Sequence, residues 1–285
     1  MKNILVTGEH GQLGSCFKKA TQNYPDLKFF FKSSSELNIC DKPALKRLFA
    51  EENFDWVINC AAYTNVEKAE SEEGKAFEIN AEAVRNLAEV CKISEVKLVH
   101  FSTDYVFDGH ASRPYKESDE TNPINVYGAS KLKGEGYIAG TLKFYFIFRT
   151  SWLYSEFGHN FYKTILRKIE EKAELNITTS QIGTPTNAND LATFVLKLII
   201  SDNKEYGLYH ISNSGQATWY DFAATILEFT ENSEVIQLNK SDKFKTLAAR
   251  PGFSVLDKTK LKETFSNSIP NWKESLRHLI ASRVS

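Results

Sequence analysis

The feature that most constrains the fold is a set of three spaced glycines directly after the first apolar run of the chain. The run KNILVT (2–7) is typical of a parallel-sheet strand that is buried on both faces. It continues into TGEHGQLG, which supplies Gly8, Gly11 and Gly14 before a helix-like segment. In such a turn the glycines allow a tight bend, close approach of backbone N–H groups to a pyrophosphate, and close helix–strand packing. The turn therefore predicts a dinucleotide site in the first strand–helix unit.

Apolar runs and helix-like segments continue to alternate along the first half of the chain. Further strand-like runs are Leu27–Phe31, Trp56–Cys60, Val96–Ser102 and Lys143–Arg149, and helix-like segments include Pro43–Glu52 and Gly74–Lys92. This alternation predicts an α/β fold with a doubly wound parallel sheet. We expect a Rossmann-like cofactor domain over residues 1–151 and a smaller C-terminal substrate lobe over 152–285. In the second half, helical segments and the strand-like GLYHIS suggest that some later segments return to the sheet.

Composition and charge exclude several classes of function. The chain has 285 residues and a formal net charge of −1, so no basic face is expected and nucleic acid is not a predicted partner. No apolar run is long enough to span a bilayer, so no membrane partner is expected. The four cysteines lack CxxC spacing, which fits a reducing cytoplasm. The six histidines lack zinc-ligand spacing, so we expect no catalytic metal.

The end of the second strand bears on which cofactor binds. An acid at this position would hydrogen-bond the ribose 2′-hydroxyl of NAD. The strand instead ends in FFFKSSSE, where Lys32 is followed by three serines. A lysine with neighbouring hydroxyls suits a 2′-phosphate, so we expect NADPH, with NADH as the alternative.

The stretch VYGASKLKGE (126–135) carries the strongest candidate for catalysis. On a helix, Tyr127 and Lys131 lie one turn apart on the same face, and a nearby ammonium favours the phenolate of a tyrosine. An isolated YxxxK pattern also fits an ordinary surface helix. However, Thr103 ends the fourth strand-like run, and ligands of doubly wound sheets bind at the carboxyl ends of strands. We therefore expect Thr103, Tyr127 and Lys131 to form one acid–base set.

This acid–base set resembles that of the short-chain dehydrogenases/reductases, and the glycine spacing resembles that of their extended branch. Seven motifs occur in order over nearly the whole chain: GQLG, CAAYTNVEKAE, FSTDYVFDG, YGASKLKGE, RTSWLY, GTPTNANDLA and AARPGFSVLD. Together they resemble the dTDP-4-dehydrorhamnose reductases. The resemblance implies reduction of the C4 keto group of dTDP-4-dehydro-L-rhamnose to dTDP-L-rhamnose, the last step of dTDP-rhamnose synthesis. It leaves open a homodimer and a magnesium ion, for which no ligands are assigned.

The resemblance also implies roles for single residues. Tyr127 is the implied proton donor, Lys131 lowers its pKa and holds the nicotinamide ribose, and Thr103 hydrogen-bonds the substrate oxygen. Together with Lys32, which is expected from the end of the second strand, the cofactor-binding residues are Gly8, Gly11, Gln12, Leu13, Gly14, Asn38, Ala61, Ala62, Tyr63, Tyr127 and Lys131. The implied substrate-binding residues are Thr103, Asp104, Tyr105, Tyr127, Trp152 and Arg250.

Three positions depart from the expected pattern. Asn38 replaces an aspartate that touches adenine in many members of the family. Glu9 and His10 are unusual in a turn that binds an anion. We expect a small effect, because such a turn binds through backbone donors, and we expect Glu9 to point outward.

Two other interpretations stay open. An extended-family epimerase shares the tyrosine and lysine, whereas a 4,6-dehydratase follows the strand-end threonine with Asp-Glu; here Asp104 precedes Tyr105. The second interpretation is a non-catalytic subunit that resembles the regulatory subunit of methionine adenosyltransferase. The retained Thr103, Tyr127 and Lys131 favour an enzyme.

Overall fold

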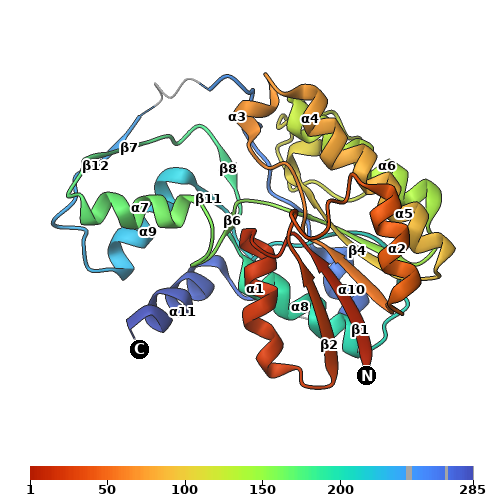
Figure 1. Cartoon of the computed structure of the whole chain (residues 1–285). Coiled ribbons are helices and arrows are strands. Elements are labelled where there is room, and N and C mark those ends of the chain that lie inside the picture. The colour runs from red at the N-terminus through yellow and green to blue at the C-terminus, as the bar shows by residue number, and fades with distance from the viewer. Residues whose placement is uncertain (242–245, 267–268, 285) are drawn as a thin grey trace.

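Six parallel strands form the central sheet, in the order β10-β5-β4-β3-β1-β2 (Figure 1). The computed structural model describes residues 1–241, 246–266 and 269–284. The strands are β1 (Lys2–Thr7), β2 (Leu27–Lys32), β3 (Trp56–Asn59), β4 (Lys97–Thr103), β5 (Tyr145–Thr150) and β10 (Gly207–His210). The strand order reverses at β1, which lies between β2 and β3. This is the point where open α/β sheets bind ligands, outside the carboxyl ends of their strands.

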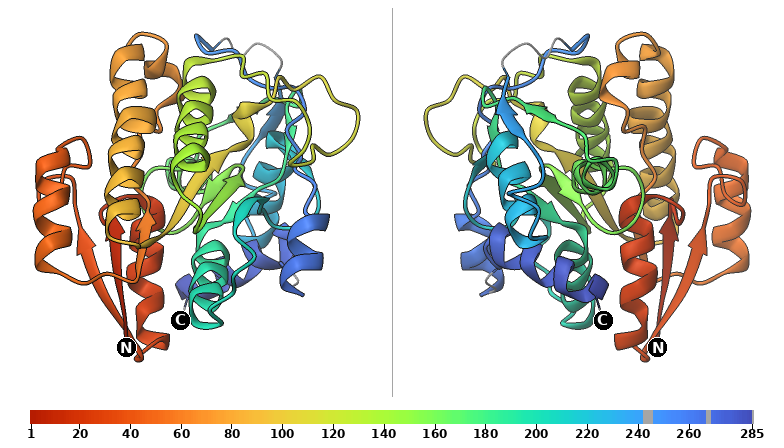
Figure 2. Two further views of the ribbon diagram at one scale, coloured as in Figure 1. Left: turned by 90° about the vertical axis from the view of Figure 1, so that its right-hand side faces the viewer. Right: turned by 90° about the vertical axis from the view of Figure 1, so that its left-hand side faces the viewer.

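Helices cover both faces of the sheet, which confirms the predicted doubly wound arrangement. On one face lie α1 (Gln12–Ala20), α8 (Ala188–Ile200) and α10 (Thr259–Phe265), and on the other α2 (Lys42–Glu51), α5 (Ala83–Ile93) and α6 (Val126–Thr141) (Figure 2). Alternate side chains of each strand enter the two cores. In β1, Ile4 and Val6 pack with the first set of helices, and Leu5 packs with the second. Both faces are therefore buried, which explains the continuous apolar runs in the sequence.

The expected helix Gly74–Lys92 is interrupted in the structure. Its parts are α4 (Glu73–Phe77), a π-helical turn (Glu78–Glu82) and α5. The π-turn places the Asn80 side chain in the interior, where it bonds both the N–H and the C=O of Tyr63 and the hydroxyl of Ser130. Such turns are frequent at functional sites, and this one fixes the loop that follows β3.

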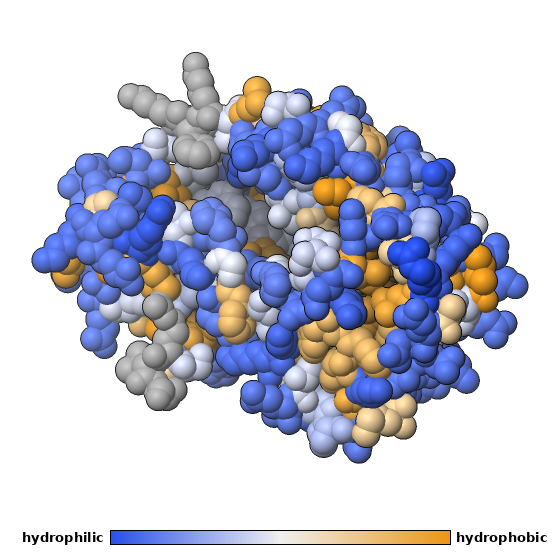
Figure 3. All heavy atoms as spheres, viewed as in Figure 1, coloured by the Kyte–Doolittle hydropathy of each residue, from blue (hydrophilic) through white to orange (hydrophobic). Residues whose placement is uncertain are grey.

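Most of the second half forms a smaller part of the molecule beside the sheet, at the left of Figure 1. It contains α7 (Phe161–Glu170), α9 (Trp219–Phe229), α11 (Trp272–Val284) and the short paired strands β6 (Leu153–Tyr154), β7 (Leu175–Ile177), β8 (Ile182–Gly183), β9 (Thr186–Asn187), β11 (Ala217–Thr218) and β12 (Leu238–Lys240). This lobe has a core of its own, centred on Tyr154, Tyr162, Phe222 and Trp272. The surface is hollowed between the lobe and the sheet (Figure 3). No helix in the described part of the chain has the length and apolarity needed to cross a membrane.

Candidate active site

A cavity of about 710 Å³ lies at the carboxyl ends of the central strands. The expected site residues that line it are Gly11, Gln12, Leu13, Ala62, Thr103, Asp104, Tyr105, Tyr127, Lys131, Trp152 and Arg250. A second cavity of about 500 Å³ shares Gly11 and Ala62 with the first, and its lining includes Gly8, Asn38 and Ala61. Gly14, Lys32 and Tyr63 are not among the lining residues of either cavity. The two cavities meet at the glycine turn.

The glycine turn has the geometry that a pyrophosphate site needs. Gly8 has a positive φ of 71°, and a Cβ there would lie 2.7 Å from the backbone nitrogen of Ala61. A Cβ on Gly14 would lie 2.3 Å from the carbonyl oxygen of Gly8, so Gly14 supports the turn from beneath. α1 begins at Gln12 without a side-chain cap, which leaves its first N–H groups available to an anion. The Glu9 carboxylate is partly buried and bonds Lys18 at 2.6 Å, so it does not point outward as expected.

Three buried N–H or O–H groups around the larger cavity also fit a ligand. Within the described residues, Nε2 of Gln12, Oγ1 of Thr150 and Nε of Arg250 have no hydrogen-bond partner. Buried polar atoms are rarely left unpaired in a folded protein. Together with the glycine turn, they fit a dinucleotide cofactor and a polar substrate.

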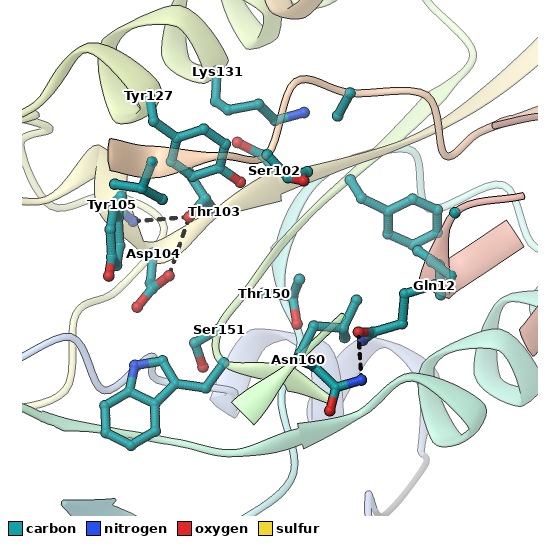
Figure 4. Close-up of a pocket in the computed structure, with 18 of the residues that line it drawn as sticks. Gln12, Ser102, Thr103, Asp104, Tyr105, Tyr127, Lys131, Thr150, Ser151 and Asn160 are labelled. Atoms are coloured by element: carbon teal, nitrogen blue, oxygen red, sulfur yellow. Dashed lines mark hydrogen bonds between the residues drawn. The ribbon is translucent and has the colours of Figure 1, made fainter. Parts of the chain in front are cut away.

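The catalytic helix α6 packs tightly against the segment that follows β4. Asn125 caps this helix, because its side chain accepts a hydrogen bond from the N–H of Gly128 at 2.7 Å. A Cβ on Gly128 would lie 2.1 Å from the carbonyl oxygen of Tyr105, so only glycine permits this approach. Tyr127 and Lys131 consequently point into the cavity beside the end of β4 (Figure 4). Gly128, which lies between Tyr127 and Lys131, thus explains how α6 brings the phenol and the ammonium to the end of β4.

Thr103 and Asp104 lie buried at the end of β4. The Thr103 hydroxyl donates to Oδ1 of Asp104 at 3.1 Å and accepts a hydrogen bond from the N–H of Tyr105 (Figure 4). Burial raises the pKa of Asp104 to about 7, although hydroxyls of Ser254 and Thr103 partly oppose this. Asp104 therefore changes charge in the neutral range.

The pKa of Tyr127 lies above its ordinary value in the structure. Burial raises the pKa of Tyr127 to about 12, and the Asp104 carboxylate adds to the rise while the Thr103 hydroxyl opposes it. Burial also lowers the pKa of Lys131 to about 8. Loss of solvation is the largest cause of both shifts, and a lowering of the Tyr127 pKa by Lys131 stays a prediction.

Trp152 and Arg250 line the cavity, and each has a protein partner. The Trp152 indole stacks on Trp219 with ring centroids 3.6 Å apart and planes 5° from parallel. The Arg250 guanidinium bonds Oε1 of Glu67 at 2.7 Å through Nη2. Glu67 lies on α3 (Val66–Ala69), so it joins the first half of the chain to the segment that carries Arg250.

The structure adds an acid at the end of β2 that the sequence interpretation did not find. Glu36 accepts hydrogen bonds from the N–H of Ser33 at 2.9 Å and from its hydroxyl at 2.6 Å. The loop thus folds the Glu36 carboxylate back toward the end of β2, although Glu36 lies four residues after Lys32, the last residue of the strand. The local pattern Ser-x-x-Glu, in which the glutamate bonds back to the N–H of the serine, could have signalled this return.

Other cavity residues were also missed by sequence interpretation. Thr150 ends β5 in the way that Thr103 ends β4, and Ser151 follows it, so the strand-end rule applied to every strand would have found them. Asn160 and Trp219 come from the lobe, and no sequence signal places them at the cavity. Asn160 donates to Oε1 of Gln12 at 3.0 Å, across the hollow (Figure 4).

The described ranges 1–241, 246–266 and 269–284 contain no group of three or more His, Cys, Asp or Glu side chains that could hold a metal ion. The structure therefore assigns no ligands to the magnesium ion that the family resemblance left open.

Known proteins of one family are similar to this chain over nearly its full length. The family described as the RmlD substrate binding domain matches residues 1–284. A dTDP-4-dehydrorhamnose reductase of Sinorhizobium fredii is 37% identical over 97% of this chain and 96% of its own. A crystal structure of a dTDP-4-dehydrorhamnose reductase from Clostridium acetobutylicum is 38% identical with a TM-score of 0.93, covering 99% of this chain and 100% of that one. The reductase of Bacillus anthracis, in complex with NADP, is 35% identical with a TM-score of 0.93 and the same coverage.

Proposed function

This chain belongs to the dTDP-4-dehydrorhamnose reductase family, and we propose on that basis that it reduces the C4 keto group of dTDP-4-dehydro-L-rhamnose to dTDP-L-rhamnose. It is an oxidoreductase that uses NADPH. The observation that carries the proposal is the meeting of Thr103, Tyr127 and Lys131 in one cavity beside the glycine turn.

We propose the following roles for the residues of the cavity. Bound NADPH supplies the hydride that reaches C4. Tyr127 donates a proton to the oxygen on C4, and its raised pKa keeps the phenol protonated until the oxygen gains charge. The Thr103 hydroxyl bonds the same oxygen. Lys131 holds the nicotinamide ribose, and the N-terminus of α1 binds the pyrophosphate.

The sugar nucleotide is proposed to bind between the sheet and the lobe. Asp104 and Tyr105 border the sugar, and the Trp152 indole gives it an apolar surface. Arg250 contacts the diphosphate, because its unpaired Nε donor suits a phosphate oxygen. Residues 152–285 thus act mainly in substrate binding. All four cysteines are free thiols, which is usual in the cytoplasm, where we propose that the enzyme works.

The alternative functions have less support. A 4,6-dehydratase needs a second acid after Asp104, and the position holds Tyr105, which is buried with its pKa raised far above its usual value. A non-catalytic subunit has no use for a complete acid–base set. Neither alternative has an observation of its own in the cavity.

The proposal is tested with purified protein, NADPH and enzymatically prepared dTDP-4-dehydro-L-rhamnose, by following loss of reduced-nicotinamide absorbance. We expect oxidation of NADPH by the wild type and a loss of about 10²–10⁴-fold in Tyr127→Phe. Tyr137→Phe, on the same helix with its hydroxyl bonded to Glu82, is the matched control and should keep full activity. A folded wild type that binds NADPH but does not oxidise it would contradict the proposed substrate.

A further inference from the structure

Behind Lys131 lies a buried chain of polar side chains that the proposed reaction does not use. Nζ of Lys131 lies 3.2 Å from Nε2 of His100, and Nδ1 of His100 lies 3.0 Å from Nδ2 of Asn59. Oδ1 of Asn59 accepts hydrogen bonds from the Thr7 hydroxyl at 2.6 Å and from the N–H of Ala61 at 3.3 Å. Lys131, His100, Asn59 and Thr7 are each at most 2% exposed, so the chain is shielded from water.

The direction of these hydrogen bonds is determined at the Ala61 end. A backbone N–H can only donate, so the oxygen of the Asn59 amide faces Ala61 and its NH₂ group faces His100. Nδ1 of His100 must then accept. A neutral imidazole carries one N–H, which is consequently on Nε2 and points at Lys131. An ammonium has no lone pair to accept this bond, whereas an uncharged amine has one.

The opposite arrangement is required when Lys131 carries its charge. The ammonium then donates to Nε2 of His100, so the ring N–H must lie on Nδ1. The Asn59 amide has to turn its oxygen toward this N–H and its NH₂ group toward the Thr7 hydroxyl. The N–H of Ala61 loses its acceptor in this arrangement. The two states therefore differ by the weak hydrogen bond of Ala61 and by the direction of the bond between Thr7 and Asn59, in which the hydroxyl donates in the first state and accepts in the second.

We propose that His100 is a positioning residue whose tautomer is coupled to the charge of Lys131, with Nε2–H facing the amine and Nδ1–H accompanying the ammonium. The proposal rests on the proposed reductase function, in which Lys131 must be a cation to hold the ribose and stabilise the developing phenolate. The hydrogen bonds that run from His100 through Asn59 to Thr7 then set the pH at which Lys131 loses its charge. The ring loses a proton from Nε2 and gains one at Nδ1, so it stays neutral; the one proton taken up from solvent overall resides on Lys131.

The other groups around Lys131 determine where this exchange falls on the pH scale. Glu135, one turn further along α6, favours the ammonium, but it is paired with Arg149 of β5 at 2.7 Å and also bonded to Ser102 of β4. Cys60, after β3, stays a neutral thiol because burial raises its pKa well above the usual value. Tyr127 is protonated below its pKa of about 12.

The pKa of His100 lies well below its usual value because of burial and the neighbouring Lys131. The ring is therefore neutral over the working range, and only its tautomer can change. Burial lowers the pKa of Lys131 to about 8, so the tautomer should change near pH 8.

The test is ¹⁵N NMR of the histidine rings in the cofactor-free, substrate-free wild type between pH 6 and 10, with His100 assigned through its backbone. We expect Nδ1–H at low pH, Nε2–H at high pH, and a midpoint near 8. His210 is the internal control: it is also buried and neutral, with its pKa lowered to about 3, but its Nδ1 lies 3.0 Å from the carbonyl oxygen of Tyr115. It should show Nδ1–H throughout.

A variant of Thr7, the last residue in the series of hydrogen bonds that starts at Lys131, predicts the direction in which the tautomer midpoint moves. Thr7→Val removes the acceptor that the Asn59 NH₂ group needs when Lys131 is an ammonium. When Lys131 is an amine, the Asn59 oxygen still accepts the hydrogen bond from the N–H of Ala61. The tautomer midpoint and the alkaline limb of kcat/KM should both move to lower pH. A single His100 tautomer over the whole range, or an unmoved midpoint in Thr7→Val, would overturn the proposal. Because the NMR measurement contains no substrate, its result is independent of whether the proposed reaction is correct.

Discussion

At the scale of single residues, the cavity assigns different tasks to groups that titrate at different pH values. Tyr127, with a pKa of about 12, stays protonated throughout the physiological range and is ready to donate. Asp104 and Lys131, with pKa values of about 7 and 8, change charge within that range. The pH dependence of the enzyme should therefore report these two groups rather than the phenol.

Asp104→Asn should change the pH dependence of stability. The pKa of Asp104 is raised in the folded protein, so its contribution is fully present below about pH 4 and is lost as pH rises through about 7. Wild type and variant should thus be similar at pH 4, and the variant should be more stable at pH 8, by about 1.4 kcal/mol for each pKa unit of the shift. Denaturant unfolding at both pH values measures this. Asp119→Asn is the control of opposite sign, because Arg113 lowers the pKa of Asp119 to about 2. Equal stability of wild type and Asp104→Asn at pH 8 would contradict the assignment.

At the scale of elements, α6 contains glycines with opposite requirements. A Cβ on Gly134 would lie 2.2 Å from the carbonyl oxygen of Asn80, and one on Gly128 would lie 2.1 Å from that of Tyr105. A Cβ on Gly136 meets nothing within 4 Å. The helix thus uses two glycines for contact with its neighbours and carries two more, Gly136 and Gly140, without such a need.

Alanine substitutions in α6 should separate these two kinds of glycine. Gly136→Ala should stabilise the protein by about 1 kcal/mol, because alanine is the better helix former. Gly128→Ala should destabilise it and reduce kcat, since the helix must move away from Tyr105 and takes Tyr127 with it. Thermal unfolding and the NADPH assay measure both effects. Full activity in Gly128→Ala would show that the close packing of α6 is not needed for proton donation.

Elements formed by local sequence were predictable, and those formed by distant contacts were not. The strands β1 to β5 follow from their apolar runs, and Tyr127 and Lys131 follow from helical spacing. GLYHIS looked like a strand, but its pairing with β5, between residues about 60 apart, has no local signal. The π-turn around Asn80 and the contact of His100 with Lys131 likewise depend on how α6 packs on the sheet. Sequence patterns therefore located the acid–base set but not the groups that support it.

At the scale of the whole molecule, the two halves of the chain meet on both sides of the cavity. On one side Gln12 bonds Asn160, and Lys19 of α1 pairs with Glu156 at 2.7 Å. On the other side Glu67 reaches the segment that carries Arg250. The cavity is thus bordered by residues from both halves, and the proposed substrate site depends on how the halves are joined.

Glu67→Gln should weaken binding of the sugar nucleotide while leaving cofactor binding intact. The Glu67 carboxylate accepts hydrogen bonds from Nη2 of Arg250 and from the N–H groups of Leu247 and Ala248, at 2.7, 2.7 and 3.3 Å. Removing its charge weakens all three, so Arg250 is held less firmly where the diphosphate is proposed to bind. We expect the KM for the dTDP-sugar to rise about tenfold, equivalent to about 1.4 kcal/mol, with little change in NADP⁺ affinity. Glu171→Gln, which breaks an exposed pair with Lys168 on α7, is the control and should change neither. An equal loss of affinity for both ligands would mean that Glu67 holds the fold as a whole, and an unchanged KM would remove Arg250 from the substrate site.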